Sequence, residues 1–140
     1  MYDIYLAAPF FNKEEIEIYN RAIERLRAQG YKVFVPREHE IPNAWEMSNR
    51  EWAKSVYTAD FKAIEQSKIV VALNFGMYSD SGTAWEMGYA TALNKTVVQV
   101  LCGDENTVYS LMALSSADMV TDIVNIRVWN TVNLDKVIQK

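Results

Sequence analysis

The sequence has very few of the residues that bind metals or form disulfides. Cys102 is the only cysteine and His39 the only histidine among 140 residues. A single cysteine cannot form an internal disulfide, and a lone free thiol suits a reducing cytoplasm. One histidine and one cysteine do not supply the ligands of a closed zinc site, so we expect no metal centre.

The sequence also lacks the patterns of membrane, secreted and nucleic-acid-binding proteins. No apolar run approaches the ~20 residues that a membrane-spanning helix needs. The N-terminus has no basic region followed by an apolar stretch, so no signal peptide is expected. The net charge of −4 argues against binding to a phosphate backbone, which requires a concentrated basic face. We therefore expect a cytoplasmic protein without membrane or nucleic-acid partners.

The order of apolar and polar segments predicts a single α/β domain over residues 1–140. Strands that alternate with helices form a parallel sheet covered on both faces. We expect a doubly wound, flavodoxin-like and Rossmann-like sheet with the strand order 2-1-3-4-5. Strands are expected at 3–8, 32–35, 69–73, 96–101 and within 119–128, and helices at 12–29 and 48–67 (with Asn12 and Ser48 as N-caps), from 82 onward, at 107–113 and at 133–140.

Residues 74–90 have the character of a ligand-binding turn between a strand and a helix. The apolar run at 69–73 is typical of a buried parallel strand. Polar residues and glycine then break the run, and helical spacing begins at Gly82. Asp80 lies in the turn, and Glu86 lies in the second helical turn among small and aromatic neighbours. We therefore expect two carboxylates at this end of the sheet.

A third carboxylate, Asp60, falls on the apolar face of the helix expected at 48–67. It lies four residues after Val56 and four before Ile64, and Trp52 continues the same stripe. Burying a carboxylate on such a face is costly unless the group is paired or used in chemistry. Two interpretations are open: a partly buried, hydrogen-bonded acid, or a site acid whose pKa is raised by burial.

The expected topology brings several of these side chains to one crevice. In the order 2-1-3-4-5, ligands bind outside the carboxyl ends of strands one and three. Tyr5 and Phe11 belong to the first of these ends, and Asp80 and Glu86 to the second. Paired carboxylates in a crevice suit displacement at an anomeric carbon, where one acid is the nucleophile and another handles the proton of the leaving group.

Several other chemistries lack their sequence motifs. There is no GxxxxGK(S/T) loop and no GxGxxG turn, so P-loop and dinucleotide-binding functions gain no support. There is no GxSxG elbow that could use His39 in a catalytic triad.

Three blocks of the sequence resemble the nucleoside 2-deoxyribosyltransferase family. They are IYLAAPFF near the N-terminus, YTADFKAI at 57–64 and DSGTAWEMGYA at 80–90. They occur in the family's order within residues 4–112, and the spacing of Asp80 six residues before Glu86 is the most specific mark. The resemblance implies transfer of the 2-deoxyribosyl group between the nucleobases of 2′-deoxynucleosides, by a retaining double displacement and without a cofactor.

The resemblance assigns catalytic roles to three residues. Glu86 matches the nucleophile that attacks C1′ and forms a covalent deoxyribosyl ester. Asp60 matches the acid that protonates the departing nucleobase and later deprotonates the incoming one. Tyr5 matches the tyrosine whose hydroxyl holds the nucleophile in place. The helix dipole is expected to keep Glu86 ionised, and burial is expected to raise the pKa of Asp60.

The resemblance also implies five substrate-binding residues. Asp80 matches a carboxylate that binds sugar hydroxyls, and Gly82 belongs to the same D-x-G-T motif. Phe11 lies where the family places an aromatic ring beside the base. Ser110 and Met112 lie where a neighbouring subunit inserts an Asn-x-Met segment, which implies a homo-oligomer, and Ser110 departs from the family's Asn. Asp80 is alternatively a helix N-cap, and the two roles are compatible.

Two rival functions stay open. A hydrolase of 2′-deoxynucleoside 5′-monophosphates would use water as the acceptor, and relatives of that kind carry Ser and Arg in the first loop and Ser at the position of Asp80. Residues 7–12 carry no such cation here, and Asp80 would repel a phosphate, whereas Ser110 favours the hydrolase. The other rival is a non-enzymatic nucleotide-binding module.

The loop at 36–47 has two prolines and no periodicity, and loops of this length are often functional. Trp45 and Met47 in this loop, and Trp52 shortly after it, are interpreted either as nucleobase contacts or as ordinary packing.

Overall fold

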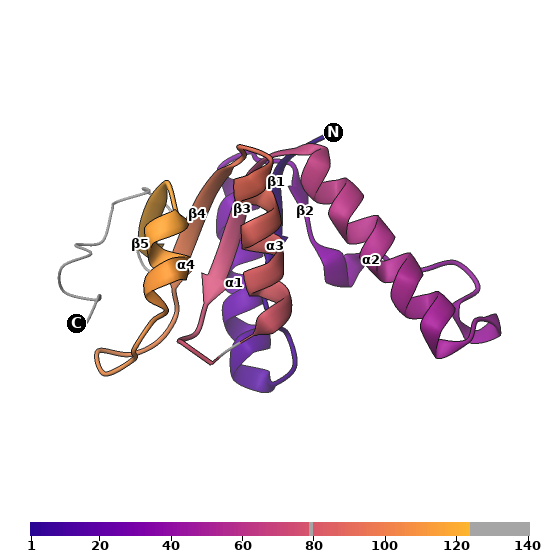
Figure 1. Cartoon of the computed structure of the whole chain (residues 1–140), viewed down its shortest axis with the longest axis horizontal. Coiled ribbons are helices and arrows are strands. Elements are labelled where there is room, and N and C mark those ends of the chain that lie inside the picture. The colour runs from indigo at the N-terminus through magenta and orange to yellow at the C-terminus, as the bar shows by residue number, and fades with distance from the viewer. Residues whose placement is uncertain (79, 124–140) are drawn as a thin grey trace.

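The centre of the protein is a five-stranded sheet in which all neighbouring strands are parallel (Figure 1). The strand order is β2-β1-β3-β4-β5, which confirms the predicted α/β class and the order 2-1-3-4-5. The computed structural model describes residues 1–78 and 80–123. The strands are β1 (Tyr2–Ala7), β2 (Val33–Phe34), β3 (Ser67–Asn74), β4 (Thr96–Leu101) and β5 (Met119–Asp122).

Each of the four described α-helices begins at a side-chain N-cap. Such a cap accepts one of the first amide groups, which have no partner within the helix. Among the described residues, no helix combines the length and the apolar character needed to cross a membrane. The helices and their caps are α1 (Lys13–Ala28, capped by Asn12), α2 (Asn49–Glu65, capped by Ser48), α3 (Ser81–Ala92, capped by Asp80) and α4 (Leu111–Ser116, capped by Ser110).

The end of the chain differs from the sequence-based expectation. A helix was expected at 107–113, but α4 begins only at Leu111. The physical reason is local, because Thr107 is held in a turn in which its hydroxyl accepts the amide of Asp104 at 2.9 Å. Ser110 then starts the helix by accepting the amide of Ala113 at 3.4 Å. The helix expected at 133–140 and the later part of 119–128 lie outside the described residues.

Alternation along β1 decides which side chains meet which helices. Successive side chains of a strand point to opposite faces of the sheet. Ile4 and Leu6 pack in the core beneath α1, whereas Tyr5 and Ala7 pack in the core beneath α2 and α3. Tyr5 therefore lies on the face of the sheet that carries the two helices with the candidate acids.

Helix α2 extends beyond the sheet. Figure 1 shows its N-terminal half projecting away from the strands, with the preceding loop at its tip. Of the apolar stripe predicted on this helix, Ile64 is buried, but Trp52 is 47% exposed. The stripe is therefore a core contact only at its C-terminal end, because the sheet does not extend under the first turns. The part of the α2 stripe that the sheet does not cover, which includes Trp52 and Val56, lines a pocket instead.

A buried polar pair connects the end of β3 with α4. Asn74 Nδ2 donates to Gln99 Oε1 at 3.1 Å, and Gln99 Nε2 donates to the carbonyl oxygen of Ala113. Asn74 Oδ1 also accepts the amide of Gly76 at 3.0 Å. Buried polar groups that satisfy one another favour a single arrangement of the chain. This pair therefore fixes the start of the loop that follows β3.

Candidate active site

A cavity of about 610 Å³ lies between α2, α3 and the loops that follow β1 and β2. This volume is within the range of small-molecule sites. Among the eight predicted site residues, the cavity is lined by Phe11, Asp60, Asp80, Gly82 and Glu86. The structure therefore brings these five together, although they come from three different segments of the chain. Within the described ranges, no three His, Cys, Asp or Glu side chains are grouped as metal ligands.

Glu86 lies in the second turn of α3 and its Oε2 atom is buried. Burial, together with the negative charges of Asp60 and Asp80, raises the pKa of Glu86 to about 8, although the nearby Tyr5 hydroxyl lowers it in part. The expectation that the helix dipole keeps Glu86 ionised is therefore wrong. The first amides of α3 already bind the Asp80 carboxylate, so the dipole is compensated before it reaches Glu86.

Asp60 lies in the C-terminal half of α2 and faces the same cavity. Burial raises the pKa of Asp60 to about 6, which confirms the expected direction. The pair formed by Asp60 and Glu86 therefore differs in proton affinity, and Glu86 holds its proton more tightly. Two acids with different pKa values in one pocket are typical of acid–base sites.

Tyr5 lies beneath the cavity and is fully buried. Its ring stacks on Phe34 of β2 with centroids 5.4 Å apart and planes 11° apart, which fixes its orientation. Tyr5 Oη and Glu86 Oε2 are both buried, and although the hydroxyl lies near enough to lower the pKa of Glu86, neither atom completes a hydrogen bond with the described residues in this conformation. Burial, together with the charges of Glu86 and Asp60, raises the pKa of Tyr5 far above its usual range. The phenol therefore stays protonated and available as a donor.

Asp80 caps α3, as one of its two interpretations predicts. Its Oδ2 accepts the amide of Thr83 at 2.8 Å and the Thr83 hydroxyl at 2.5 Å, and its Oδ1 accepts the amide of Gly82 at 3.3 Å. A Cβ atom at Gly82 would lie 3.4 Å from Asp80 Oδ2, in ordinary contact. These bonds orient the Asp80 carboxylate at the wall of the cavity, where a substrate hydroxyl can reach it.

Phe11 is 77% exposed at the mouth of the cavity, and its ring stacks on Phe10 with centroids 5.8 Å apart. Phe10 packs against Tyr19 of α1, with centroids 5.5 Å apart, and also lines the cavity. Phe10 is therefore partly a core residue, as expected, and partly a cavity wall.

Ser110 and Met112 do not line the cavity that holds Glu86. Ser110 borders a separate cavity of about 320 Å³ on the other side of Asp80, and its hydroxyl caps α4. Met112 is 79% exposed. A third cavity, of about 640 Å³, lies beside the start of α1 and contains none of the predicted residues. A role for Ser110 and Met112 in the pocket of a neighbouring subunit stays a prediction.

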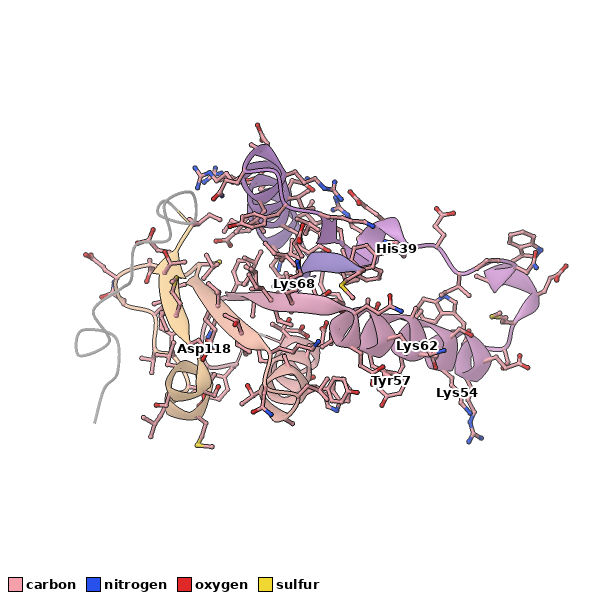
Figure 2. All side chains as sticks on the ribbon, turned by 90° about the horizontal axis from the view of Figure 1, so that it is seen from above. His39, Lys54, Tyr57, Lys62, Lys68 and Asp118 are labelled. Carbon is pink, nitrogen blue, oxygen red and sulfur yellow. The ribbon has the colours of Figure 1, made fainter. Side chains whose placement is uncertain are left out.

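The loop between β2 and α2 adds cavity residues that the sequence did not single out. Arg37, His39 and Glu40 all line the same cavity as the three acids. Figure 2 shows His39 on the opposite side of α2 from Tyr57. The length of the loop and its two prolines were the only sequence signal, and they did not indicate which side chains turn inward.

The raised pKa of Glu86 predicts how stability depends on pH. The native state holds this proton up to about pH 8, whereas the unfolded chain releases it near the ordinary value of 4.5. The native state therefore loses stability as pH rises from 4.5 to 8. Glu86→Gln should remove this loss. The unfolding free energy of the variant, minus that of the wild type, should therefore increase as pH rises through this window, at most by about 1.4 kcal/mol per pH unit.

Urea unfolding of both proteins between pH 5 and pH 8.5 measures this difference. Glu24→Gln, on the exposed face of α1, is the matched control and should follow the wild type. A constant difference between Glu86→Gln and the wild type across the window would contradict the assignment.

Comparison with known proteins identifies the family of this chain. The family model described as nucleoside 2-deoxyribosyltransferase matches residues 4–127. A solved 2-deoxyribosyltransferase from the psychrotolerant bacterium Bacillus psychrosaccharolyticus has 31% sequence identity and a TM-score of 0.79, covering 98% of this chain and 97% of its own. No curated protein matches the sequence at a significant level.

More distant solved structures share the fold. A CMP N-glycosidase from Clostridium botulinum has 24% identity and a TM-score of 0.56, covering 86% of this chain and 85% of its own. A 2-deoxyribosyltransferase from Leishmania mexicana has 21% identity and a TM-score of 0.55, covering 85% and 74%. Because the family model spans most of the sequence and the Bacillus enzyme covers nearly all of it, this chain belongs to the nucleoside 2-deoxyribosyltransferase family.

Proposed function

We propose that this protein transfers the 2-deoxyribosyl group between the nucleobases of 2′-deoxynucleosides, through a covalent ester on Glu86. The observation that carries the proposal is the meeting of Asp60, Asp80 and Glu86 in one cavity, above the buried Tyr5. The chemistry at C1′ needs a nucleophile, a proton donor and a group that holds the sugar, and these acids can supply all three.

In the first displacement, the Glu86 carboxylate attacks C1′ and the glycosidic C–N bond breaks. The electron pair of that bond leaves with the nucleobase, and Asp60 donates a proton to the base. Asp80 accepts hydrogen bonds from sugar hydroxyls, since its carboxylate is already oriented by the amides of Gly82 and Thr83. The products of this step are a free nucleobase and a deoxyribosyl ester of Glu86.

In the second displacement, a nitrogen of the incoming nucleobase attacks C1′ of the ester. Asp60, now ionised, takes the proton from that nitrogen, and the Glu86 carboxylate leaves. Each displacement inverts the configuration at C1′, so the two together retain the β configuration. Asp60 gives one proton to the departing base and regains one from the incoming base, so both half-reactions balance, and no cofactor takes part.

The protonation of the pair requires one preparatory step. Near pH 7 the values of about 6 for Asp60 and about 8 for Glu86 place the shared proton on Glu86. Attack on C1′ needs the reverse arrangement, with Glu86 ionised and Asp60 protonated. The lowering effect of the Tyr5 hydroxyl is already part of the value of about 8, so without Tyr5 the ionised form of Glu86 would be rarer still.

The rival hydrolase of deoxynucleoside 5′-monophosphates draws support from Arg37. This residue is a cation in the cavity, which the sequence had not indicated. However, Arg37 already donates to Asn20 Oδ1 at 2.6 Å, and its guanidinium lies 5.2 Å from the centre of the Tyr19 ring. Asp80 also places a negative charge in the same cavity. We therefore rank the hydrolase second and a non-enzymatic nucleotide-binding module third.

We also propose that the protein is a cytoplasmic homo-oligomer and that it acts in nucleotide salvage. Met112 and Leu111 at the start of α4 are 79% and 58% exposed, and Met112 lines no part of its own Glu86 cavity. Exposed apolar side chains next to a site suit contact with a second copy of the chain. In this arrangement, Ser110 and Met112 complete the cavity of a neighbouring subunit.

The transfer itself is tested by incubating thymidine with adenine and separating the products by chromatography. Deoxyadenosine and thymine should appear together, and Glu86→Ala should lower the rate by at least three orders of magnitude because it removes the nucleophile. Free base and deoxyribose phosphate from a deoxynucleotide, without transfer, would establish the hydrolase instead. A lack of turnover with pyrimidine and purine donors and with nucleotides would leave the binding module.

The pH dependence tests the protonation of the pair. The active form carries one proton on Asp60 and Glu86, so kcat/KM should be bell-shaped with limbs near pH 6 and pH 8. Tyr5→Phe removes the donor that lowers the pKa of Glu86. It should therefore reduce kcat/KM by about tenfold and move the alkaline limb to higher pH. Tyr2→Phe on the same strand is the control, and an alkaline limb unmoved by Tyr5→Phe would refute the role of Tyr5.

Subunit complementation tests the oligomer. Glu86→Ala and Met112→Ala are each expected to reduce activity, because each damages the composite site. Refolding the two variants together should restore part of the activity, since hybrid assemblies contain sites with an intact Glu86 and a neighbour's intact Met112. Activity no higher than the average of the two separate variants, or a monomer by light scattering, would refute the shared site.

A further inference from the structure

His39, the only histidine of the sequence, takes no part in the steps described above, although it lines the cavity. Its ring lies on Phe34, with centroids 4.1 Å apart and planes 14° apart. Phe34 in turn stacks on Tyr5, with centroids 5.4 Å apart and planes 11° apart. The three rings are therefore nearly parallel, and this ring stack connects the loop after β2 with the tyrosine beside the Glu86 carboxyl group.

The middle ring of the stack has a neighbouring strand on one side only. Strand β2 is the edge of the described sheet and contains only Val33 and Phe34. On its inner side, Phe34 is the register partner of Tyr5 in β1, and Tyr2 of β1 adds an edge-on contact with ring centroids 5.1 Å apart. No strand lies beyond β2 in the part of the chain that the structure describes, so the His39 ring supplies a contact that a further strand would otherwise make.

The turn that carries His39 is anchored to α1. Pro36–Glu38 form a single 3-10 turn, and the amide of His39 donates to the carbonyl oxygen of Pro36 at 3.1 Å. The Arg27 guanidinium of α1 donates to both carboxylate oxygens of Glu38, at 2.9 and 2.6 Å. Bidentate pairs of this kind fix geometry as well as adding energy. The position of His39 is therefore set by its chain neighbours, and its own side chain stays exposed.

The orientation of the Tyr5 ring matters because its hydroxyl acts on Glu86 at the limit of a hydrogen bond. The two atoms do not complete a bond in this conformation, yet the hydroxyl lowers the pKa of Glu86 in part. Hydrogen bonds weaken steeply with distance and angle. A small tilt of the phenol therefore changes how well it stabilises the ionised Glu86 carboxylate.

We propose that His39 is a positioning residue for the nucleophile: its ring holds Phe34 against Tyr5 and keeps the Tyr5 hydroxyl directed at Glu86. The proposal rests on the transferase function stated above, in which the ionised Glu86 attacks C1′. His39 acts through the flat shape of its ring, and the imidazole transfers no proton. Substitutions in the ring stack should therefore affect activity only through Tyr5.

The test must leave the charges around Glu86 unchanged. Phe34→Leu meets this condition, because it removes the middle ring of the stack and keeps an apolar side chain. His39→Ala tests the outer ring without touching the core, and His39→Phe keeps a flat ring without the imidazole. Besides His39, the titratable and charged groups around Glu86 are Tyr5 of β1, Tyr19 of α1, Arg37 and Glu40 of the loop, Asp60 of α2 and Asp80 at the start of α3.

The first test is a double-mutant cycle on kcat/KM for thymidine with adenine as acceptor. Phe34→Leu and His39→Ala should each lower kcat/KM by about fivefold and move the alkaline limb of its pH profile to higher pH, as Tyr5→Phe does. In the Tyr5→Phe background the same substitutions should cost less than about twofold, because the hydroxyl that they position is gone. His39→Phe should retain the activity and the pH profile of the wild type.

Tyr57→Leu is the matched control, because it also removes a ring from an aromatic cluster but lies outside the cavity. Tyr57 has ring centroids 5.2 Å from Phe61 and 5.5 Å from Trp85, and Figure 2 shows it on the opposite side of α2 from His39. It should leave the rate and the pH profile unchanged. Equal losses with and without the Tyr5 hydroxyl, an unmoved alkaline limb, or a loss of activity in His39→Phe would overturn the positioning role.

Failure of the transferase function has a separate signature. If the wild type transfers from no donor, the ionisation of Glu86 is measured by NMR titration of protein with 13C-labelled glutamate carboxyl groups, and Glu86→Gln assigns the signal. Phe34→Leu and His39→Ala should move the titration midpoint upward by about 0.5, in the same direction as Tyr5→Phe, whereas His39→Phe and Tyr57→Leu should not. An unmoved midpoint in Phe34→Leu and His39→Ala would overturn the positioning role whether or not the protein is a transferase.

Discussion

The burial of the Glu86 carboxyl group against the sheet is the constraint on which the rest of the site depends. The group lies near Tyr5 of β1 and Asp60 of α2, and its pKa is raised to about 8 because water is largely excluded. A buried polar group without full hydrogen bonding destabilises the fold. Its neighbour Met87 packs beside it against the apolar face of the sheet, and this burial offsets the cost.

The scaffold separates what must be rigid from what must admit a substrate. Tyr5 is fixed by stacking on Phe34, and Asp80 is fixed by the first amides of α3, so both are oriented before a substrate arrives. The first half of α2 instead extends beyond the sheet and exposes an apolar face. The cavity is therefore lined in part by surface that the core does not cover.

The family relationship and the physical chemistry of the site agree, but they answer different questions. The match over residues 4–127, and the Bacillus structure at 31% identity, establish the fold and the family. Which acid holds the proton, and which loop residues face the cavity, follow from this chain's own burial and contacts. Arg37 and His39 illustrate this, since they line the cavity here from a loop whose sequence shows no periodicity.

The sequence by itself determined the strand order, the N-caps of α1 and α2, and the placement of Asp80 and Glu86 on one turn and helix. These features depend on residues a few positions apart, where hydrophobic period and capping fix the backbone. Only the tertiary structure decided that burial raises the pKa of Glu86, that α4 starts at Leu111, and that the loop before α2 lines the cavity. The pKa of a buried acid depends on burial and charges contributed by every element packed around it, and a local sequence pattern does not contain this information.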